Sequence, residues 1–354
     1  MKLLGIDFKN GALLLFLLGI FGLIGVLAVD KFHFAFYAFQ EGVPDFSSAW
    51  LTRSFFIFLF CLLLLIGLGN LRKPTFTIDM PQHYFLPLPA IVLALFLSLL
   101  FILIFVVSPS TFGQSALEDG PVEWASADFL FAACLVMMYV FVRELKNKDM
   151  HWFIKLSLLA LAGVFFVMGM EEVSWFQRVF HIETPAEFKG NIQDEMNLHN
   201  FATNYVENAY YFGSFVYLVV FPFIRLIYRE VEKVAYFKIF VARPFIALIG
   251  ATACAYNYDM WNIVFMQITF YGAVVIVAYY ALMSANGIDK LLSWTALVLL
   301  LVPQWIYLTH GADFLRTWDV TEYREMLMPL AFFIYTVDLA IQCKRHYRQA
   351  SDVA

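Results

Sequence analysis

The sequence predicts an all-α protein, a polytopic transmembrane helical bundle of about ten spans with both termini in the cytoplasm. Three observations lead to this prediction. Hydrophobic residues make up 62% of the chain and charged residues 14%, whereas soluble domains are about half apolar and a quarter charged. The apolar residues form runs of about 20, the length of a helix that crosses a bilayer. Most Lys and Arg residues also fall in every second loop between these runs, and therefore on one side of the membrane, as the positive-inside rule requires.

The apolar runs define the spans in chain order. The first, 11–29, is long enough to cross a bilayer and is interpreted as a retained helix rather than a cleaved signal. The least regular pair is the seventh and eighth, which are separated only by a short turn at Asn257 to Asp259 and which also fit a re-entrant hairpin. The predicted spans are 11–29, 53–70, 85–107, 127–144, 152–170, 205–227, 238–256, 261–283, 293–309 and 327–343.

The distribution of basic residues sets the orientation. With the N-terminus inside, most of the 23 Lys and Arg residues fall on the cytoplasmic side. The predicted cytoplasmic loops are short and the outer segments are longer, so we expect the function to reside at the outer face of a bacterial inner membrane. The six basic residues predicted outside are Lys31, Arg53, Arg178, Lys189, Arg316 and Arg324.

The principal polar outer segment is predicted at 171–204, directly after the fifth apolar run. No helix breaker lies between Met170 and Phe180, so we expect the helix to continue and to place Glu171, Ser174 and Arg178 on one face. Glu172 then lies on a neighbouring face. Thr184 followed by proline is typical of the capped start of a second helix.

The densest polar stretch of the chain lies within this segment, at 191–200. If it is helical, Gln193, Asn197 and Asn200 form one stripe. Glu195 and His199 then stand four residues apart, the spacing of an acid–base pair or of two metal ligands. Three interpretations remain open: a surface pair, a structural role in which the amides satisfy loop backbone, and a catalytic or ligand-binding role.

A second polar outer loop is predicted at 310–326. His310 and Asp313 are three residues apart at the end of the ninth run, where the alternatives are a solvated loop end and a pair of metal ligands. Glu322 and Glu325 have the same spacing before the tenth run. We interpret this second pair as acidic residues in the first turn of a helix, where they favour its dipole.

Within the apolar runs, Asp338 is the most conspicuous polar residue. An ionisable side chain at that depth faces the bundle or serves a function. It has two candidate partners, Arg243 and Arg53.

The string E-E-V-S-W-F-Q-R-V-F, followed by T-P and then N-I-Q-D-E-M-N-L-H-N, resembles a block found in a group of bacterial multi-span membrane proteins to which no activity is attached. That group has a small residue where this chain has Phe176. The resemblance covers only the segment 171–200 and names no substrate. It implies that one set of residues acts as a unit, namely Glu171, Glu172, Ser174, Gln177, Arg178, Gln193, Glu195, Asn197, His199 and Asn200.

Three classes of function fit these patterns. The first is an enzyme acting on a membrane lipid or lipid-linked substrate, with Glu171, Glu172, Glu195 and His199 as catalytic groups. Ser174, Gln177, Arg178, Gln193, Asn197 and Asn200 are then its candidate substrate-binding residues. This enzyme uses either Glu as a base for group transfer or a divalent metal for hydrolysis, with His199, His310 and Asp313 as ligands.

The second class is a transporter or channel that uses Asp338, and the third is a scaffold that binds a protein partner or a second copy of the chain. The sequence contains no P-loop, no GxSxG motif and no HExxH motif. It also contains no basic–aromatic patch that would predict nucleic-acid binding.

Overall fold

A computed structural model describes the chain apart from residues 1, 4–5, 8–9, 34–38, 71–85, 192–194 and 352–354, and for 2–10 and 346–351 it describes the backbone only. Apart from turns and loops, the described residues form helices and one pairing of two short strands, β1 (Lys2–Leu3) and β2 (Ile6–Asp7). The long helices are α1 (Asn10–Phe32), α2 (Ser48–Gly69), α3 (Pro87–Val107), α5 (Pro121–Glu144), α6 (Trp152–Glu172), α7 (Thr203–Phe215), α11 (Val264–Met283), α12 (Gly287–Thr309) and α13 (Asp319–Ser351). The short elements are α4 (Pro109–Ser115), α8 (Phe221–Ile227), α9 (Ala235–Phe240) and α10 (Phe245–Thr252), together with the turns η1 (Ser174–Phe176), η2 (His199–Phe201), η3 (Val216–Val220), η4 (Arg229–Lys233), η5 (Ala253–Ala255) and η6 (Gly311–Asp313).

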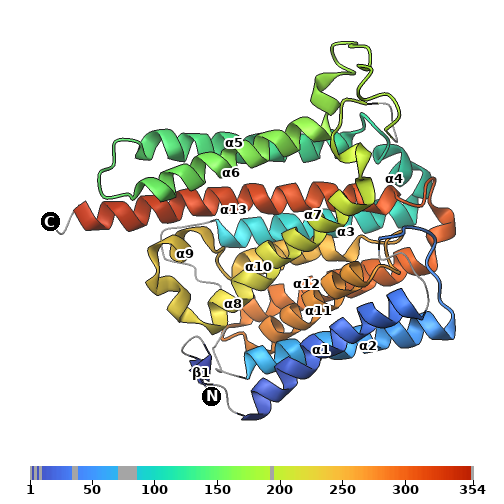
Figure 1. The fold of residues 1–354 in the computed structure, drawn as a ribbon, viewed down its shortest axis with the longest axis horizontal. Coiled ribbons are helices and arrows are strands. Elements are labelled where there is room, and N and C mark those ends of the chain that lie inside the picture. The colour runs from blue at the N-terminus through green and yellow to red at the C-terminus, as the bar shows by residue number, and fades with distance from the viewer. Residues whose placement is uncertain are drawn as a thin grey trace.

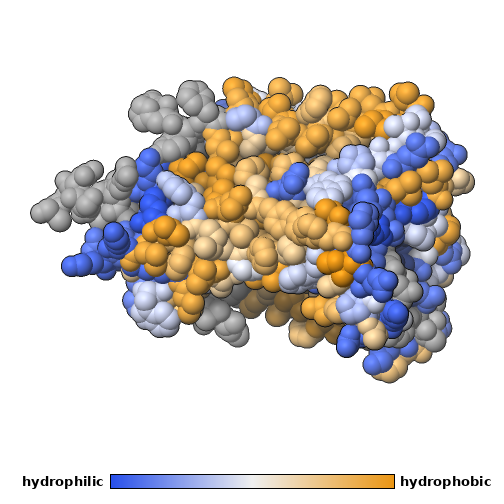
Figure 2. All heavy atoms as spheres, turned by 90° about the horizontal axis from the view of Figure 1, so that it is seen from above, coloured by the Kyte–Doolittle hydropathy of each residue, from blue (hydrophilic) through white to orange (hydrophobic). Residues whose placement is uncertain are grey.

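Nine helices of the described chain are long and apolar enough to cross a membrane. They confirm the prediction of an integral membrane protein with many spans, because nine of the ten predicted runs coincide with them. Apolar side chains cover the middle of the face in Figure 2, and hydrophilic ones gather toward its two ends. The spans are Gly11–Phe32, Ser48–Gly69, Pro87–Val107, Pro121–Glu144, Trp152–Glu172, Thr203–Ile227, Val264–Met283, Gly287–Thr309 and Asp319–Arg345.

The helices run roughly side by side (Figure 1). α5 and α6 pack on each other and on α13 along one side of the bundle, and α10 lies in its interior against α3, α12 and α13. α11 joins this core to α2, and α1 packs outside α2 at the far edge. We call the end where α6 ends and α13 begins the polar end. α1 begins and α13 ends at the opposite end (Figure 1).

The predicted seventh span, 238–256, is not one long helix. The chain instead forms α9, then the eight-residue α10 and the turn η5, and an irregular buried segment follows to Ile263. Its two ends nevertheless contact opposite ends of α13, because Arg243 binds Asp338 whereas Asp259 binds Thr321. Those two α13 residues are separated by roughly 25 Å of helix. The interrupted segment therefore traverses most of the bundle.

Two buried ion pairs hold helices together. The guanidinium of Arg243 lies against both carboxylate oxygens of Asp338, with Nε at 2.9 and 3.0 Å, and Gln342 adds a hydrogen bond. This confirms the first of the two partners predicted for Asp338. Arg53 of α2 instead binds Asp30 of α1, with Nε at 2.7 Å from Oδ1. Both pairs keep their charges satisfied where water is excluded.

Glycines let α1 and α2 approach closely. A Cβ on Gly67 would lie 2.6 Å from the backbone nitrogen of Phe16, and a Cβ on Gly22 would lie 2.2 Å from the ring of Phe60. Small residues at such crossings bring helices into van der Waals contact, which drives helix association in lipid.

Candidate functional site

The α6 helix ends at Glu172 instead of continuing to Phe180 as predicted. Ser174, Trp175 and Phe176 follow with φ values of 47°, 54° and 59°, so three successive residues adopt the left-handed conformation. Such residues cost about 1–2 kcal/mol each, and this backbone persists only where surrounding contacts hold it. Glu171, Ser174 and Arg178 therefore do not share one helical face, and the turn redirects Ser174 toward the loop beyond it.

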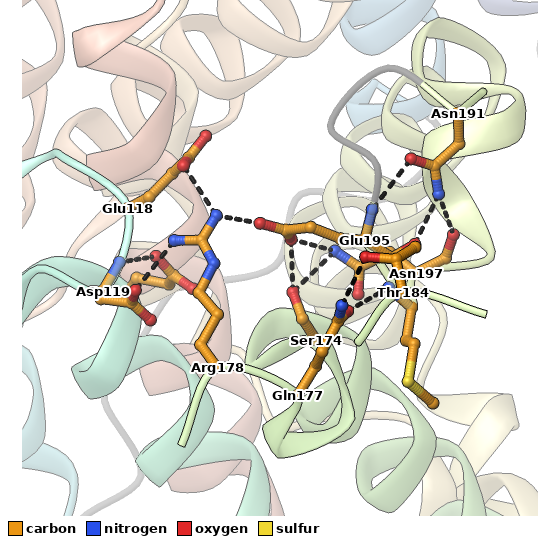
Figure 3. A network of polar contacts seen from close by, with 11 residues as sticks. Glu118, Asp119, Ser174, Gln177, Arg178, Thr184, Asn191, Glu195 and Asn197 are labelled. Carbon is orange, nitrogen blue, oxygen red and sulfur yellow. Dashed lines mark hydrogen bonds and ion pairs between the residues drawn. The ribbon is translucent and has the colours of Figure 1, made fainter. Parts of the chain in front are cut away.

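Glu195 is the centre of the first polar network, shown in Figure 3. The hydroxyl of Ser174 donates to Glu195 Oε2 at 2.5 Å, and Asn197 Nδ2 donates to the same oxygen at 3.1 Å. Arg178 binds the other oxygen. Glu195 is 8% exposed, and its carboxylate is satisfied entirely by protein groups.

Arg178 joins this network to the loop before α5. Its Nη1 lies 2.8 Å from Asp119 and its Nη2 lies 2.7 Å from Glu118. Partial burial acts to lower the pKa of Arg178, but the hydrogen bonds to Asp119 and Glu118 raise it above its ordinary value. One guanidinium thus binds three carboxylates and ties two loops together.

Glu171 binds the backbone of the same loop from the other side. Its Oε2 accepts from the nitrogen of Leu198 at 2.7 Å and from that of His199 at 3.2 Å, and Oε1 accepts from Trp175 Nε1 at 2.7 Å. The Nδ1 of His199 also lies 3.2 Å from Oε2. The predicted pairing of Glu195 with His199 is therefore wrong, because 195–198 is not helical and each residue has another partner.

The amides of the segment bind loop backbone. Gln177 Oε1 accepts from the nitrogen of Met196 at 2.7 Å, while its Nε2 donates to Thr184 at 2.8 Å. Asn191 Nδ2 donates to the carbonyl of Glu195 at 2.6 Å. The helix predicted after Thr184 does not form, because 186–190 is a run of turns.

Of the remaining predicted residues, Asn200 is buried at 3% exposure in η2. Gln193 lies outside the described residues. The described part of the polar segment is therefore a network whose charges and amides bind one another, which favours a structural role for Glu195, Gln177 and Arg178.

A second group of acidic side chains lies beneath this network, and Glu172 is the only predicted site residue that belongs to it. We call it the carboxylate cluster. Its members are partly accessible or buried, and each interacts electrostatically with at least one other member. Glu325 is their common neighbour, because Glu41, Glu172, Glu207 and Glu322 all interact with it. The cluster consists of Glu41, Glu172, Glu207, Asp259, Glu322 and Glu325.

Neighbouring hydroxyl groups position the cluster. The Tyr211 hydroxyl donates to Glu325 Oε1 at 2.5 Å, and the Thr321 hydroxyl donates to Asp259 Oδ1 at 2.5 Å. The Glu41 Oε1 atom and the Tyr210 hydroxyl are buried and make no hydrogen bond among the described residues. Polar atoms buried without a partner are rare in folded proteins.

Positive charge near the cluster is scarce. Arg324 is 1% exposed; it hydrogen-bonds Thr269 at 3.1 Å and stacks its guanidinium over the Tyr211 ring at 4.5 Å. Arg316 reaches Glu322 at 3.5 Å but binds Asp319 more closely, at 2.9 Å. His199, which contacts Glu171 of the polar network, also interacts electrostatically with Glu325.

Two members of the cluster lie outside the spans and titrate near neutral pH. Burial raises the pKa of Glu41 to about 7, and the charges of Asp259 and Glu325 add to this effect. Burial also raises the pKa of Asp259 to about 6, although its hydrogen bond from Thr321 acts in the opposite direction.

These raised pKa values predict how stability depends on pH. The folded protein holds protons on Glu41 and Asp259 that the unfolded chain releases, so the free energy of unfolding falls as the pH rises from about 4 to about 7. Glu41→Gln removes one of these protons, and we expect its melting temperature to fall less between pH 4.5 and pH 7.5 than that of the wild type. Glu183→Gln, at an exposed residue, is the control. Equal pH dependence in wild type and Glu41→Gln would contradict the prediction.

The proposed metal ligands do not form a group. His310 is exposed at the end of α12, where its Nδ1 lies 2.9 Å from the Thr309 hydroxyl, and Asp313 is exposed in η6. His199 contacts Glu171 instead. Among the described residues, no three His, Cys, Asp or Glu side chains are arranged to hold a metal ion.

The sequence patterns identified only Glu172 as a site residue of the carboxylate cluster. They did not single out Glu207 or Asp259, and they favoured a helix-dipole role for Glu322 and Glu325. The available signal was the pair Glu322 and Glu325 on a face of α13 that also carries buried residues of the bundle. No family model, curated protein or solved structure matches the chain.

Proposed function

We propose that this integral membrane protein is an enzyme that acts on a lipid or lipid-linked substrate at the carboxylate cluster. The observation that carries the proposal is the position of Glu172 and Glu325. Both are partly accessible and interact with each other at the polar end of the bundle, where Glu172 closes one span and Glu325 lies near the start of another. Facing carboxylates in different surroundings are the usual apparatus of general acid–base catalysis.

Glu325 and Glu172 have different hydrogen-bonding surroundings, as a general base and a general acid require. Tyr211 fixes Oε1 of Glu325, and no described residue hydrogen-bonds its Oε2. The Ser126 hydroxyl lies beside Glu172 and donates to the carbonyl oxygen of Glu325 at 2.9 Å. We assign Glu325 as the base that activates a hydroxyl group or water, and Glu172 as the acid that protonates the leaving group. The reaction is then a hydrolysis or group transfer.

The polar network supports the site rather than performing the chemistry. Glu171 holds the backbone of His199, and His199 interacts electrostatically with Glu325. Glu195 and Arg178 tie this loop to the loop before α5. The positive-inside rule places this end of the bundle outside the bacterial inner membrane in our proposal, where a lipid headgroup reaches it.

Lipid composition in cells tests the proposal. Lipid extracts from cells that lack the protein should differ from the wild type in at least one lipid class, measured by mass spectrometry. Expression of the wild type or of Glu183→Gln should restore that class, whereas Glu325→Gln and Glu172→Gln should fail to do so at equal protein levels. Restoration by both cluster variants would contradict the proposal.

The interrupted seventh span favours one second candidate, a proton-coupled transporter. Discontinuous helices commonly surround transport sites, and the break after η5 brings Asp259 into the cluster. Proteoliposomes with an internal pH dye distinguish the two functions. A substrate-dependent proton flux that Asp259→Asn abolishes would favour transport, whereas chemical conversion of a lipid without flux would favour the enzyme.

A further inference from the structure

A cavity of about 600 Å³ opens between α1 and α2, away from the carboxylate cluster. Its walls are apolar side chains and glycine backbone, among them Val26, Val29, Phe56 and Phe60. Gly25 faces open space, because a Cβ built there meets no atom within 4 Å. The two helices touch where Gly22 meets Phe60. The cavity therefore forms a groove beside this close contact.

The groove lies inside the membrane-spanning part of the chain. Both of its helices are candidate spans, and they form one edge of the bundle (Figure 1). An open apolar groove at that depth faces hydrocarbon rather than water, so its occupant must be a hydrocarbon chain. From Gly22 to Asp30 the α1 wall extends for about 12 Å along the helix.

One end of the groove is polar. The buried pair Asp30 and Arg53 lies there, with the side chains of Ser48 and Thr52 beside it. An apolar trough that ends in charged and hydroxyl groups matches the shape of a single lipid, with its chain along the trough and its headgroup at the end.

Three hydrogen bonds join the polar end of the groove to the segments that carry Glu41 and Asp259. Arg53 Nη2 donates to the carbonyl of Asn262 at 2.9 Å, and Asn262 Oδ1 accepts from the nitrogen of Asp45 at 2.6 Å. The nitrogen of Gly42 donates to the carbonyl of Asp259 at 2.8 Å. The loop that carries Glu41 and the interrupted segment that carries Asp259 thus form the boundary between groove and cluster.

We propose that this groove binds the hydrocarbon chain of the lipid substrate and directs its headgroup toward Glu41 and Asp259. The role as a substrate site rests on the proposed function, whereas binding of the chain does not. The apolar walls exclude water from the chain, and the Asp30–Arg53 pair marks the depth at which the headgroup begins. Phe56 and Phe60 supply flat surfaces along the α2 wall.

Two glycine variants form a matched test. Gly25→Leu places a large side chain in the open groove without a backbone clash, and Gly163→Leu does the same on the lipid-facing surface of α6, where a Cβ also meets no atom within 4 Å. Each protein is reconstituted in nanodiscs with a trace of phosphatidylethanolamine carrying a diazirine at its chain end. After illumination, the labelled residues are mapped by mass spectrometry.

We expect the wild type to be labelled at Val26, Phe56 and Phe60 more strongly than at the lipid-facing residues of α6. Gly25→Leu should reduce this groove labelling about tenfold, the effect of losing roughly 1.4 kcal/mol of binding, and Gly163→Leu should leave it unchanged. Labelling that is even over all spans and insensitive to Gly25→Leu would overturn the groove as a binding site.

Measuring lipid conversion distinguishes binding of the lipid chain in the groove from catalysis at the carboxylate cluster. Gly25→Leu should lose both groove labelling and conversion, whereas Glu325→Gln should lose conversion and keep groove labelling. If Gly25→Leu loses labelling but converts lipid at the wild-type rate, the groove is not the substrate site. If Glu325→Gln converts lipid at the wild-type rate, the proposed function fails, and the substrate role of the groove fails with it even where labelling persists.

Discussion

Arg243→Ala is expected to destabilise the protein by about 3–5 kcal/mol, the cost of leaving one member of a buried ion pair without its partner. The side chain of Asp338 is 0% exposed and that of Arg243 is 7% exposed, so water cannot replace the missing guanidinium. The melting temperature of the purified variant in detergent, followed by intrinsic fluorescence, measures the effect.

The control for this prediction removes both charges. Arg243→Met combined with Asp338→Leu leaves no isolated charge and should recover most of the lost stability. Exposed Arg229 gives a matched single variant, Arg229→Ala, that should melt like the wild type. A wild-type melting temperature for Arg243→Ala would show that the pair does not hold α13 to the segment before α10.

Arg178→Ala is expected to open the polar network over the carboxylate cluster. The substitution leaves Glu118, Asp119 and Glu195 without their shared cation, and a hydrogen bond to a charged group is worth about 1.5–3 kcal/mol. The left-handed turn at Ser174 depends on the same contacts. Hydrogen exchange should therefore accelerate in residues 174–201 and stay unchanged in α11.

Arg178→Lys separates charge from shape. Lysine keeps the positive charge but has no planar fork to bind several carboxylates at once, so its hydrogen exchange should fall between that of Arg178→Ala and that of the wild type. If exchange in 174–201 is equally slow in the wild type and in Arg178→Ala, the network does not hold this loop.

The spans were predictable because each is a local property of the sequence. An apolar run of about 20 residues has few alternatives to a membrane helix, and nine of the ten runs form such helices. The seventh did not, although its residues are apolar. Ala247 to Ile249 are fully buried in the bundle, so this segment is apolar because protein surrounds it, and hydropathy does not distinguish protein from lipid surroundings.

The end of α6 shows why local patterns failed at the site. Ser174, Trp175 and Phe176 have no strong tendency to break a helix, yet they adopt positive φ. Contacts from residues about 20 positions later, at Glu195 and Asn197, determine this backbone. Tertiary hydrogen bonds override helix propensity here, and a single sequence contains no signal of them.

The sequence predicted which polar residues of the segment 171–200 act together, but it did not predict how they are arranged in space. Glu171, Ser174, Glu195 and Asn197 do lie together, as the resemblance implied. The cluster beneath them combines Glu41, Glu172, Glu207, Asp259 and Glu325 from five different segments. These segments are far apart in the sequence, so spacing along the chain did not reveal them.

The central claim is that Glu325 acts in the chemistry of the carboxylate cluster. The most direct measurement is lipid conversion by purified protein in nanodiscs that contain a total lipid extract, with products identified by mass spectrometry. Loss of a general base typically slows a reaction by about 10²–10⁴-fold. The account predicts a loss of this size for Glu325→Gln at an unchanged melting temperature, with a wild-type rate for Glu183→Gln. Conversion by Glu325→Gln at the wild-type rate would contradict it.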